Sequence, residues 1–244
     1  MLVLDRISAR FGSLQALQSV SLVLEPGARH ALIGPNGAGK TSLINIISGQ
    51  LPSARGRIHF EGQDITAMDV AQRARFGIAR SFQINQLFLE MTPVETLAMA
   101  INERKGIGGC WWHAKPYSDE TLDEARMMLH QVGLDRRAQC LVNRLAYGEQ
   151  RLLEIAIALV MRPRLLLLDE PAAGLPEDQS EALLVLLNSL PADLAILLIE
   201  HDMQLVFEFA QTISVLAQGQ IIAQGDSNSI QTNPHVRTAY LGEM

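Results

Sequence analysis

The chain lacks several features that would assign it to whole classes of protein. Only two of its 244 residues are cysteines, too few for a disulfide-stabilised secreted domain, so we expect reduced thiols in a cytosolic protein. The longest uninterrupted apolar run, Ile155 to Met161, is far shorter than a membrane-spanning helix. The sequence does not open with a basic and then apolar leader, so we expect no export.

Basic residues are also in deficit, with 20 lysines and arginines against 26 acidic residues and a net charge of -6. This balance argues against a large nucleic-acid surface, although it is compatible with docking to a membrane protein. Hydrophobic residues make up 48% of the chain and charged residues 19%, which is typical of a globular protein. The length suits one large domain with room for a subdomain.

What the sequence does contain is a phosphate-binding loop. It is preceded by an apolar segment, residues 28–33, that reads as a buried strand, and followed by an apolar helical pattern over residues 43–47. The glycines let backbone amides turn inward, and the helix N-terminus adds partial positive charge. A glycine-rich turn before an ordinary helix would explain neither the lysine nor the threonine. The loop is Gly34-Pro35-Asn36-Gly37-Ala38-Gly39-Lys40-Thr41.

Polar side chains follow three predicted strands of a parallel sheet. Residues 165–168 are four leucines followed by Asp169 and Glu170, and the strand at 194–199 precedes His201. The strand predicted at 78–83 ends on Gln83. The carboxyl edge of such a sheet is where ligands bind.

Each of these residue types fits phosphoryl transfer. Lys40 would reach the β- and γ-phosphates, and the hydroxyl of Thr41 would ligate Mg²⁺ opposite Asp169. Glu170 follows at the position to polarise an attacking water. Gln83 and His201 offer polar tips near the γ-phosphate, although a lone histidine is more often structural.

Periodicity predicts the remaining elements. Phe11, between two predicted N-terminal strands, would either stack on an adenine ring or fill the core. The segment at 105–118, with Trp111 and Trp112, reads as a loop or insertion. We predict antiparallel strands at 2–9 and 17–24, a strand and turn at 57–63, and a strand pair at 212–216 and 221–224. Helices are predicted at 65–75 (with arginines on its solvated face), 86–101, 119–132 and 177–190, and a polar turn at 145–150 opens a long apolar helix that runs through Met161.

Together these motifs resemble the ATP-binding cassette family, the ATPase subunits of ABC transporters, over essentially the full length. The loop at 34–41 looks like the family's Walker A, and residues 165–170 look like Walker B with Glu170 as the catalytic glutamate. Gln83 matches the Q-loop and His201 the switch histidine. The resemblance favours adenine stacking for Phe11.

Residues 145–150 resemble the family's Leu-Ser-Gly-Gly-Gln signature, which in the family caps the ATP bound to a partner subunit. The resemblance therefore implies two ATP molecules in a head-to-tail dimer. Ala146 stands where serine is usual, and Tyr147 replaces the first glycine, as it does in close relatives. Backbone donors remain, so we expect hydrolysis but predict no rate.

The resemblance implies the following site. The cofactors are ATP and Mg²⁺. Catalytic residues are Lys40, Gln83, Glu170 and His201, and metal ligands are Thr41, Gln83 and Asp169. Nucleotide-binding residues are Phe11, Gly34, Pro35, Asn36, Gly37, Ala38, Gly39, Lys40, Thr41, Ser42, Ala146, Tyr147, Gly148 and Glu149.

The implied fold is α/β, a P-loop NTPase core with a mixed central sheet, an N-terminal antiparallel β subdomain and an inserted α-helical subdomain. We predict the nucleotide-binding core at residues 1–83 and 161–225. The helical signature subdomain is predicted at 84–160 and a polar C-terminal tail at 226–244.

Four further features resemble those of the ATPases of branched-chain amino-acid importers. The ATPases of urea and amide importers share many of these features. These features are Pro171-Ala172-Ala173-Gly174-Leu175, Ser81-Phe82-Gln83, the insertion at 105–118 and the closing Tyr240-Leu241-Gly242. The implied partners are two transmembrane permease subunits, a second ATPase subunit (a copy or a sister chain) and an extracytoplasmic solute-binding protein, with no nucleic acid. The implied location is peripheral, on the cytoplasmic face of the inner membrane, with Phe88 near the permease groove.

Two other hypotheses are weaker. Soluble cassette ATPases of DNA repair or translation usually carry coiled-coil arms or tandem cassettes, which this sequence lacks. A regulator that no longer hydrolyses ATP would not need Lys40, Asp169, Glu170 and His201, and only Ala146 favours it.

Overall fold

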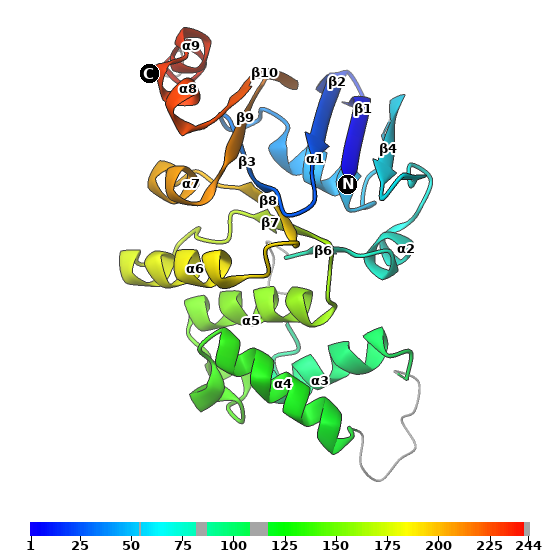
Figure 1. Cartoon of the computed structure of the whole chain (residues 1–244), viewed down its shortest axis with the longest axis vertical. Helices are drawn as coiled ribbons and strands as arrows, with labels where there is room; N and C mark the ends of the chain where they lie inside the picture. Colours follow the sequence, from blue (N-terminus) through cyan, green and yellow to red (C-terminus); the bar gives the residue numbers. More distant parts are fainter. Residues whose placement is uncertain (54, 82–86, 108–116, 242–244) are drawn as a thin grey trace. The chain divides into compact units, whose positions relative to one another are not determined.

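The computed structural model describes residues 1–53, 55–81, 87–107 and 117–241 (Figure 1). Its contacts divide the chain into two compact units. The core unit comprises Met1–Arg80, Arg164–Ala173 and Leu190–Met244, and the helical unit comprises Ser81–Pro163 and Gly174–Ser189. The domain boundaries proposed from the sequence stay a prediction.

A six-stranded sheet in the order β10-β9-β3-β8-β7-β6 organises the core unit. Neighbouring strands are parallel except β9 and β10, so the sheet is mixed, as predicted. β7 and β8 are buried along their whole length, which explains their continuous apolar sequences. The strands are β3 (Arg29–Ile33), β6 (Ile78–Arg80), β7 (Leu165–Asp169), β8 (Ala195–Ile199), β9 (Thr212–Ala217) and β10 (Gln220–Gly225).

An antiparallel sheet in the order β2-β1-β4-β5 forms the second layer of the core unit. Apolar side chains of this sheet, of α1 (Lys40–Ile47) and of one face of the mixed sheet form a single buried cluster. The predicted N-terminal antiparallel subdomain is therefore confirmed. Its strands are β1 (Leu2–Phe11), β2 (Leu14–Leu24), β4 (Arg55–Phe60) and β5 (Gln63–Asp64).

The other face of the mixed sheet carries three short helices, α7 (Met203–Phe209), α8 (Ser227–Thr232) and α9 (Pro234–Leu241). The last two lie within the segment, residues 226–244, that the sequence predicts as a polar C-terminal tail. Ile230 of α8 and Val236 of α9 belong to this buried cluster.

The predicted helix at 65–75 is shorter, because Asp69 caps it by accepting the amide of Gln72 at 2.8 Å, and α2 covers only Val70–Arg75. Its arginines are not all solvated, since Arg73 is buried. One guanidinium nitrogen of Arg73 donates to the carbonyls of Ile46 and Ile47, at 2.5 and 2.9 Å. A buried cation at the C-terminal end of α1 is stabilised by the helix dipole.

The helical unit contains the predicted helices α3 (Pro93–Arg104), α4 (Asp119–Gln131), α5 (Tyr147–Val160) and α6 (Glu177–Ser189), with 3-10 turns at Asp135–Arg137 and Val142–Arg144. α3 starts later than residue 86 because Thr92 and Glu95 form a capping box. Gln83, Trp111 and Trp112 lie outside the described residues. In the described part of the chain, no helix is long and apolar enough to cross a membrane.

His30 gives the core unit a pH-dependent stability. Its ring is buried, with Nε2 2.9 Å from Ser214 Oγ, and burial lowers the pKa of His30 from 6.5 to about 4. The unfolded chain therefore binds a proton that the folded protein does not bind as the pH falls from 6.5 toward 4.

We expect acidification across that range to remove up to about 3 kcal/mol of unfolding free energy through His30. The measurement is urea unfolding at a series of pH values, for the wild type and His30→Gln. The variant should show a flatter dependence on pH between 6.5 and 4. An equally steep loss of stability in both proteins contradicts the assignment.

Candidate active site

The loop at 34–41 joins β3 to α1 and ends in a helix start without a side-chain cap. The N-cap residue is Gly39, at φ 106°, which has no side chain to cap the first amides of α1. Gly37 also has a positive φ, 78°, and a side chain added there would meet open space. Amides at an uncapped helix start are suited to an anion such as phosphate.

A cavity of about 550 Å³ opens beside this helix start, within the usual size range of small-molecule sites, which is about 300–1,000 Å³. Phe11 and Leu14 are exposed and give it an apolar wall. The open position of Phe11 excludes the alternative of a core phenylalanine. The lining residues are Phe11, Leu14, Gln15, Ala16, Gln18, Asn36, Gly37, Ala38, Gly39, Lys40, Thr41, Ser42, Glu170, Gln218 and Gly219.

Lys40 is buried at the rim of this cavity. Its Nζ donates to the carbonyl oxygens of Gly34 at 2.6 Å and Pro35 at 2.9 Å. These two predicted binding residues do not line the cavity, and each instead has a carbonyl that holds the lysine.

Residues that the sequence did not single out hold the loop in place. The Gly219 amide donates to the Ala38 carbonyl at 3.0 Å, and the Gly219 carbonyl accepts from the Gln18 amide at 2.8 Å. A Cβ added at Gly39 or Gly219 would lie 2.5 or 2.7 Å from the Ala16 carbonyl oxygen. The turn between β9 and β10 thus connects the phosphate loop to β2. The sequence shows only that this turn contains a glycine, so it does not predict the contact.

Two of the predicted catalytic residues meet at the carboxyl edge of the sheet. Glu170 lines the cavity, and its Oε1 lies 2.7 Å from Nε2 of His201. Glu170 has φ 50°, which is uncommon for a residue other than glycine and costs about 1–3 kcal/mol. This geometry allows His201 to orient the carboxylate of Glu170.

Glu200, which the sequence placed only at a strand end, braces this pair. Its buried carboxylate accepts the amides of Ala172 at 2.7 Å and His201 at 2.9 Å. Burial raises the pKa of Glu200 above its ordinary value, although these hydrogen bonds oppose the shift. Glu200 therefore connects the segment after β7 to the segment after β8.

Asp169, the last residue of β7, is fully buried and does not line the cavity. Its Oδ2 accepts from Arg80 at 3.0 Å. Among the described residues, no three His, Cys, Asp or Glu side chains form a cluster that could hold a metal. A carboxylate and the Thr41 hydroxyl nevertheless suit Mg²⁺, which protein sites commonly bind through one or two carboxylates and substrate phosphates. The third proposed ligand, Gln83, lies outside the described residues.

The signature-like residues 146–149 begin α5 in the helical unit. Tyr147 is exposed, and a side chain added at Gly148 would overlap the Gln179 side-chain amide. The Glu149 carboxylate accepts the Ala146 amide at 2.9 Å and the Arg137 guanidinium at 2.8 Å. Glu149 thus caps its own helix and is already ion-paired.

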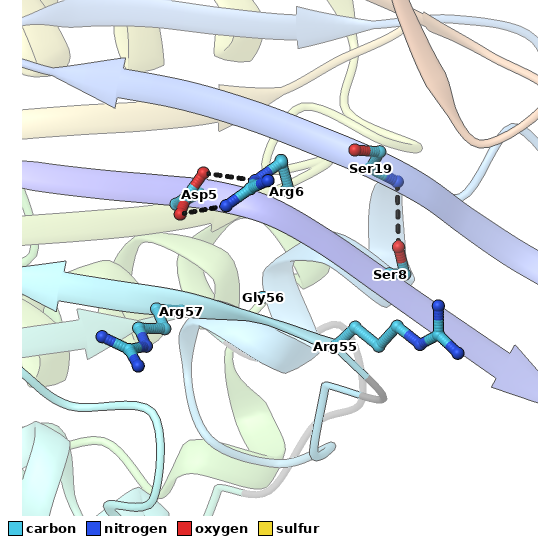
Figure 2. Close-up of a pocket in the computed structure, with 7 residues that line it drawn as sticks. All are labelled: Asp5, Arg6, Ser8, Ser19, Arg55, Gly56 and Arg57. Atoms are coloured by element: carbon cyan, nitrogen blue, oxygen red, sulfur yellow. Dashed lines mark hydrogen bonds and ion pairs between the residues drawn. The ribbon is translucent and has the colours of Figure 1, made fainter.

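A second cavity of about 730 Å³ lies on the antiparallel sheet, lined by Asp5, Arg6, Ser8, Ser19, Arg55, Gly56 and Arg57. Figure 2 shows Arg55 and Arg57 pointing toward opposite ends of β4, while Arg6 pairs with Asp5 at 3.1 Å. The guanidinium groups do not converge on one point, so this cavity is not the candidate active site.

Comparison with known proteins agrees with the geometry. Residues 17–173 match the family model described as ABC transporter, and residues 220–244 match one described as branched-chain amino acid ATP-binding cassette transporter. The chain is 40% identical to the high-affinity branched-chain amino acid transport ATP-binding protein LivG of Escherichia coli, covering 100% of this chain and 98% of the relative. It is 39% identical to BraF of Pseudomonas aeruginosa, with the same coverage.

Solved structures give the same answer. An ATP-binding cassette of an ABC transporter in its ADP conformation matches with a TM-score of 0.87 and 31% identity, over 99% of this chain and 98% of that chain. A nucleotide-free cassette from an ABC transporter matches with a TM-score of 0.84 and 30% identity, over 98% of each chain.

The contact at Gly219 generates a prediction. Gly219→Ala places a methyl group against the Ala16 carbonyl and should displace the turn that holds the loop, weakening nucleotide binding about tenfold or more. Gly62→Ala is the matched control, because Gly62 has the same φ of 76° but open space around it. Titration with a fluorescent nucleotide measures both variants, and equal affinities would contradict this role.

Proposed function

This chain belongs to the ABC transporter family, and from that premise we propose that it is the ATP-hydrolysing subunit of an importer for branched-chain amino acids. As a family member it is an ATPase that couples ATP hydrolysis to transport. The full-length likeness to LivG and BraF and the matching C-terminal segment support the amino-acid assignment. The observation that carries the chemistry is the pair of Glu170 and His201, 2.7 Å apart, at a cavity lined by the phosphate loop.

The bound nucleotide occupies the cavity beside α1, from the apolar wall at Phe11 to the start of the helix. Phe11 stacks on the adenine ring, and the amides at the start of α1 bind the phosphates. Lys40 exchanges the carbonyls of Gly34 and Pro35 for phosphate oxygens, which bind the ammonium group more strongly because they are charged.

Hydrolysis depends on positioning and on charge stabilisation. Glu170 orients a water for in-line attack on the γ-phosphorus and polarises it, while His201 holds the carboxylate in place. Thr41 and Asp169, with Gln83, would hold Mg²⁺, which would supply positive charge to neutralise the phosphates. Glu200 keeps the His201 backbone beside Ala172, so that the catalytic pair stays aligned.

A second cassette completes the site. The start of α5, at Ala146 to Gly148, faces the nucleotide of a second copy or of a sister ATPase. Because Glu149 is engaged with the Ala146 amide and Arg137, it acts as a helix cap and leaves phosphate contact to the backbone.

The remaining assignments concern partners and location. We place the chain on the cytoplasmic face of the membrane, bound to two permease subunits and served by an extracytoplasmic solute-binding protein. Phe88 and Leu89, 54% and 47% exposed, offer apolar surface for a permease. A urea or amide importer is the alternative, and the C-terminal family match favours amino acids.

Removing the general base tests the chemistry. Glu170→Gln should bind ATP, lower the hydrolysis rate about 100-fold or more and accumulate as a dimer, because the amide cannot take a proton from water. Phosphate release and light scattering measure these effects. Glu181→Gln, on the exposed side of α6, is the control. Hydrolysis at the wild-type rate in Glu170→Gln would rule out this role.

Transport itself is tested by gentle solubilisation of native membranes and identification of the proteins that co-purify with the tagged chain. Two multi-span proteins are expected, and the complex in vesicles should accumulate leucine, isoleucine or valine when ATP and the binding protein are supplied. Urea accumulation would favour the alternative importer. Recovery of the chain alone, or with ribosomes or DNA, would contradict the proposal.

A further inference from the structure

Arg80, to which the sequence analysis gave no role, lies at the centre of a buried polar network in the core unit. It is the last residue of β6 and immediately precedes the segment that contains Gln83. Its side chain is 8% exposed, and one of its terminal nitrogens lies 3.0 Å from Oδ2 of the fully buried Asp169. A charged group at this depth requires a partner, because desolvation of an isolated ion is costly.

The other terminal nitrogen of Arg80 bonds to the last turn of the phosphate-loop helix and to the turn that follows it. It donates to Asn45 Oδ1 at 2.5 Å and to Gln50 Oε1 at 2.7 Å. One rigid, planar guanidinium therefore spans the distance between α1 and the carboxylate at the end of β7. The geometry fixes which oxygen of Asp169 faces β6 and so sets the rotation of that carboxylate.

We propose that Arg80 is a positioning residue for the metal-binding carboxylate, orienting Asp169 toward the Mg²⁺ that accompanies the nucleotide. This proposal rests on the function proposed above, in which Asp169 is a metal ligand. Side chains that bond to a metal ligand from behind orient it, and their loss typically lowers metal affinity about 10–100-fold. Arg80 also transmits the position of α1 to Asp169, so the hydroxyl of Thr41 and the carboxylate keep a fixed relation.

If Arg80 acted only through its charge, its removal would change Mg²⁺ affinity in the opposite direction. A guanidinium near the site repels Mg²⁺, so a loss of that charge without a loss of orientation would strengthen metal binding. The sign of the change in Mg²⁺ requirement therefore separates positioning from simple charge repulsion.

Arg73 of α2 provides a matched control, because it is also a buried arginine whose guanidinium bonds to the C-terminal end of α1. Its guanidinium donates to the carbonyls of Ile46 and Ile47 and to those of Met68 and Thr66, all of them backbone groups away from Asp169. A substitution at Arg73 disturbs the packing of α1 without touching the metal ligand.

The experiment measures the binding of a fluorescent ATP analogue as Mg²⁺ is increased, and again in excess EDTA. Arg80→Met should raise the half-saturating Mg²⁺ concentration about 10–100-fold, while affinity in EDTA changes less than about twofold. Arg80→Lys, which keeps the charge but loses the planar fork, should fall between the wild type and Arg80→Met. Arg73→Lys should lower the unfolding temperature and leave the Mg²⁺ requirement unchanged.

If Arg80→Met does not fold, the double variant Asn45→Ala/Gln50→Ala tests the same network while it keeps the ion pair. It should raise the Mg²⁺ requirement in the same direction by a smaller factor. An unchanged or lower requirement in the Arg80 variants, or an equal shift in Arg73→Lys, overturns the proposal.

Asp169→Asn separates this inference from the function on which it rests. A raised Mg²⁺ requirement in Asp169→Asn, with none in the Arg80 variants, overturns only the role of Arg80. An unchanged requirement in Asp169→Asn overturns the metal assignment itself, and the role of Arg80 with it.

Discussion

The close backbone packing around the phosphate loop is the constraint on which the rest of the site depends. Gly34, Gly39 and Gly219 each lie where an added side chain would strike a backbone carbonyl, from Leu216 or Ala16. This packing fixes the direction of the amides at the start of α1. Without it, the cavity would lose the donors that make it suited to phosphate, and the residues at the carboxyl edge of the sheet would have no substrate to act on.

The buried acids at that edge are stabilised in two different ways. Asp169 is matched by a cation, Arg80, whereas Glu200 is matched by backbone amides. The guanidinium of Arg80 fixes one carboxylate oxygen of Asp169 and connects that residue to another secondary-structure element. The backbone amides instead bind the carboxylate of Glu200 to the chain segments beside it. The first arrangement suits a metal ligand, and the second suits a brace for the neighbouring His201.

The sequence predicted those parts whose signal is local. The phosphate loop and the leucine strand at 165–168 follow from adjacent residue types, so the structure agrees with them. Arg73, Arg80 and Gly219 could not be assigned, because their partners lie far away in the chain and appear only after folding. The roles assigned to the site residues by resemblance, and everything at Gln83, stay predictions.

The two carbonyl partners of Lys40 have a consequence for turnover. The ammonium group donates to two carbonyl oxygens of its own loop, so contact with phosphate would exchange these hydrogen bonds for new ones. The free-energy gain per phosphate contact is smaller for that reason. Release of the product is correspondingly easier, because the hydrogen bonds from Lys40 to the carbonyls of its own loop can form again when the phosphates leave.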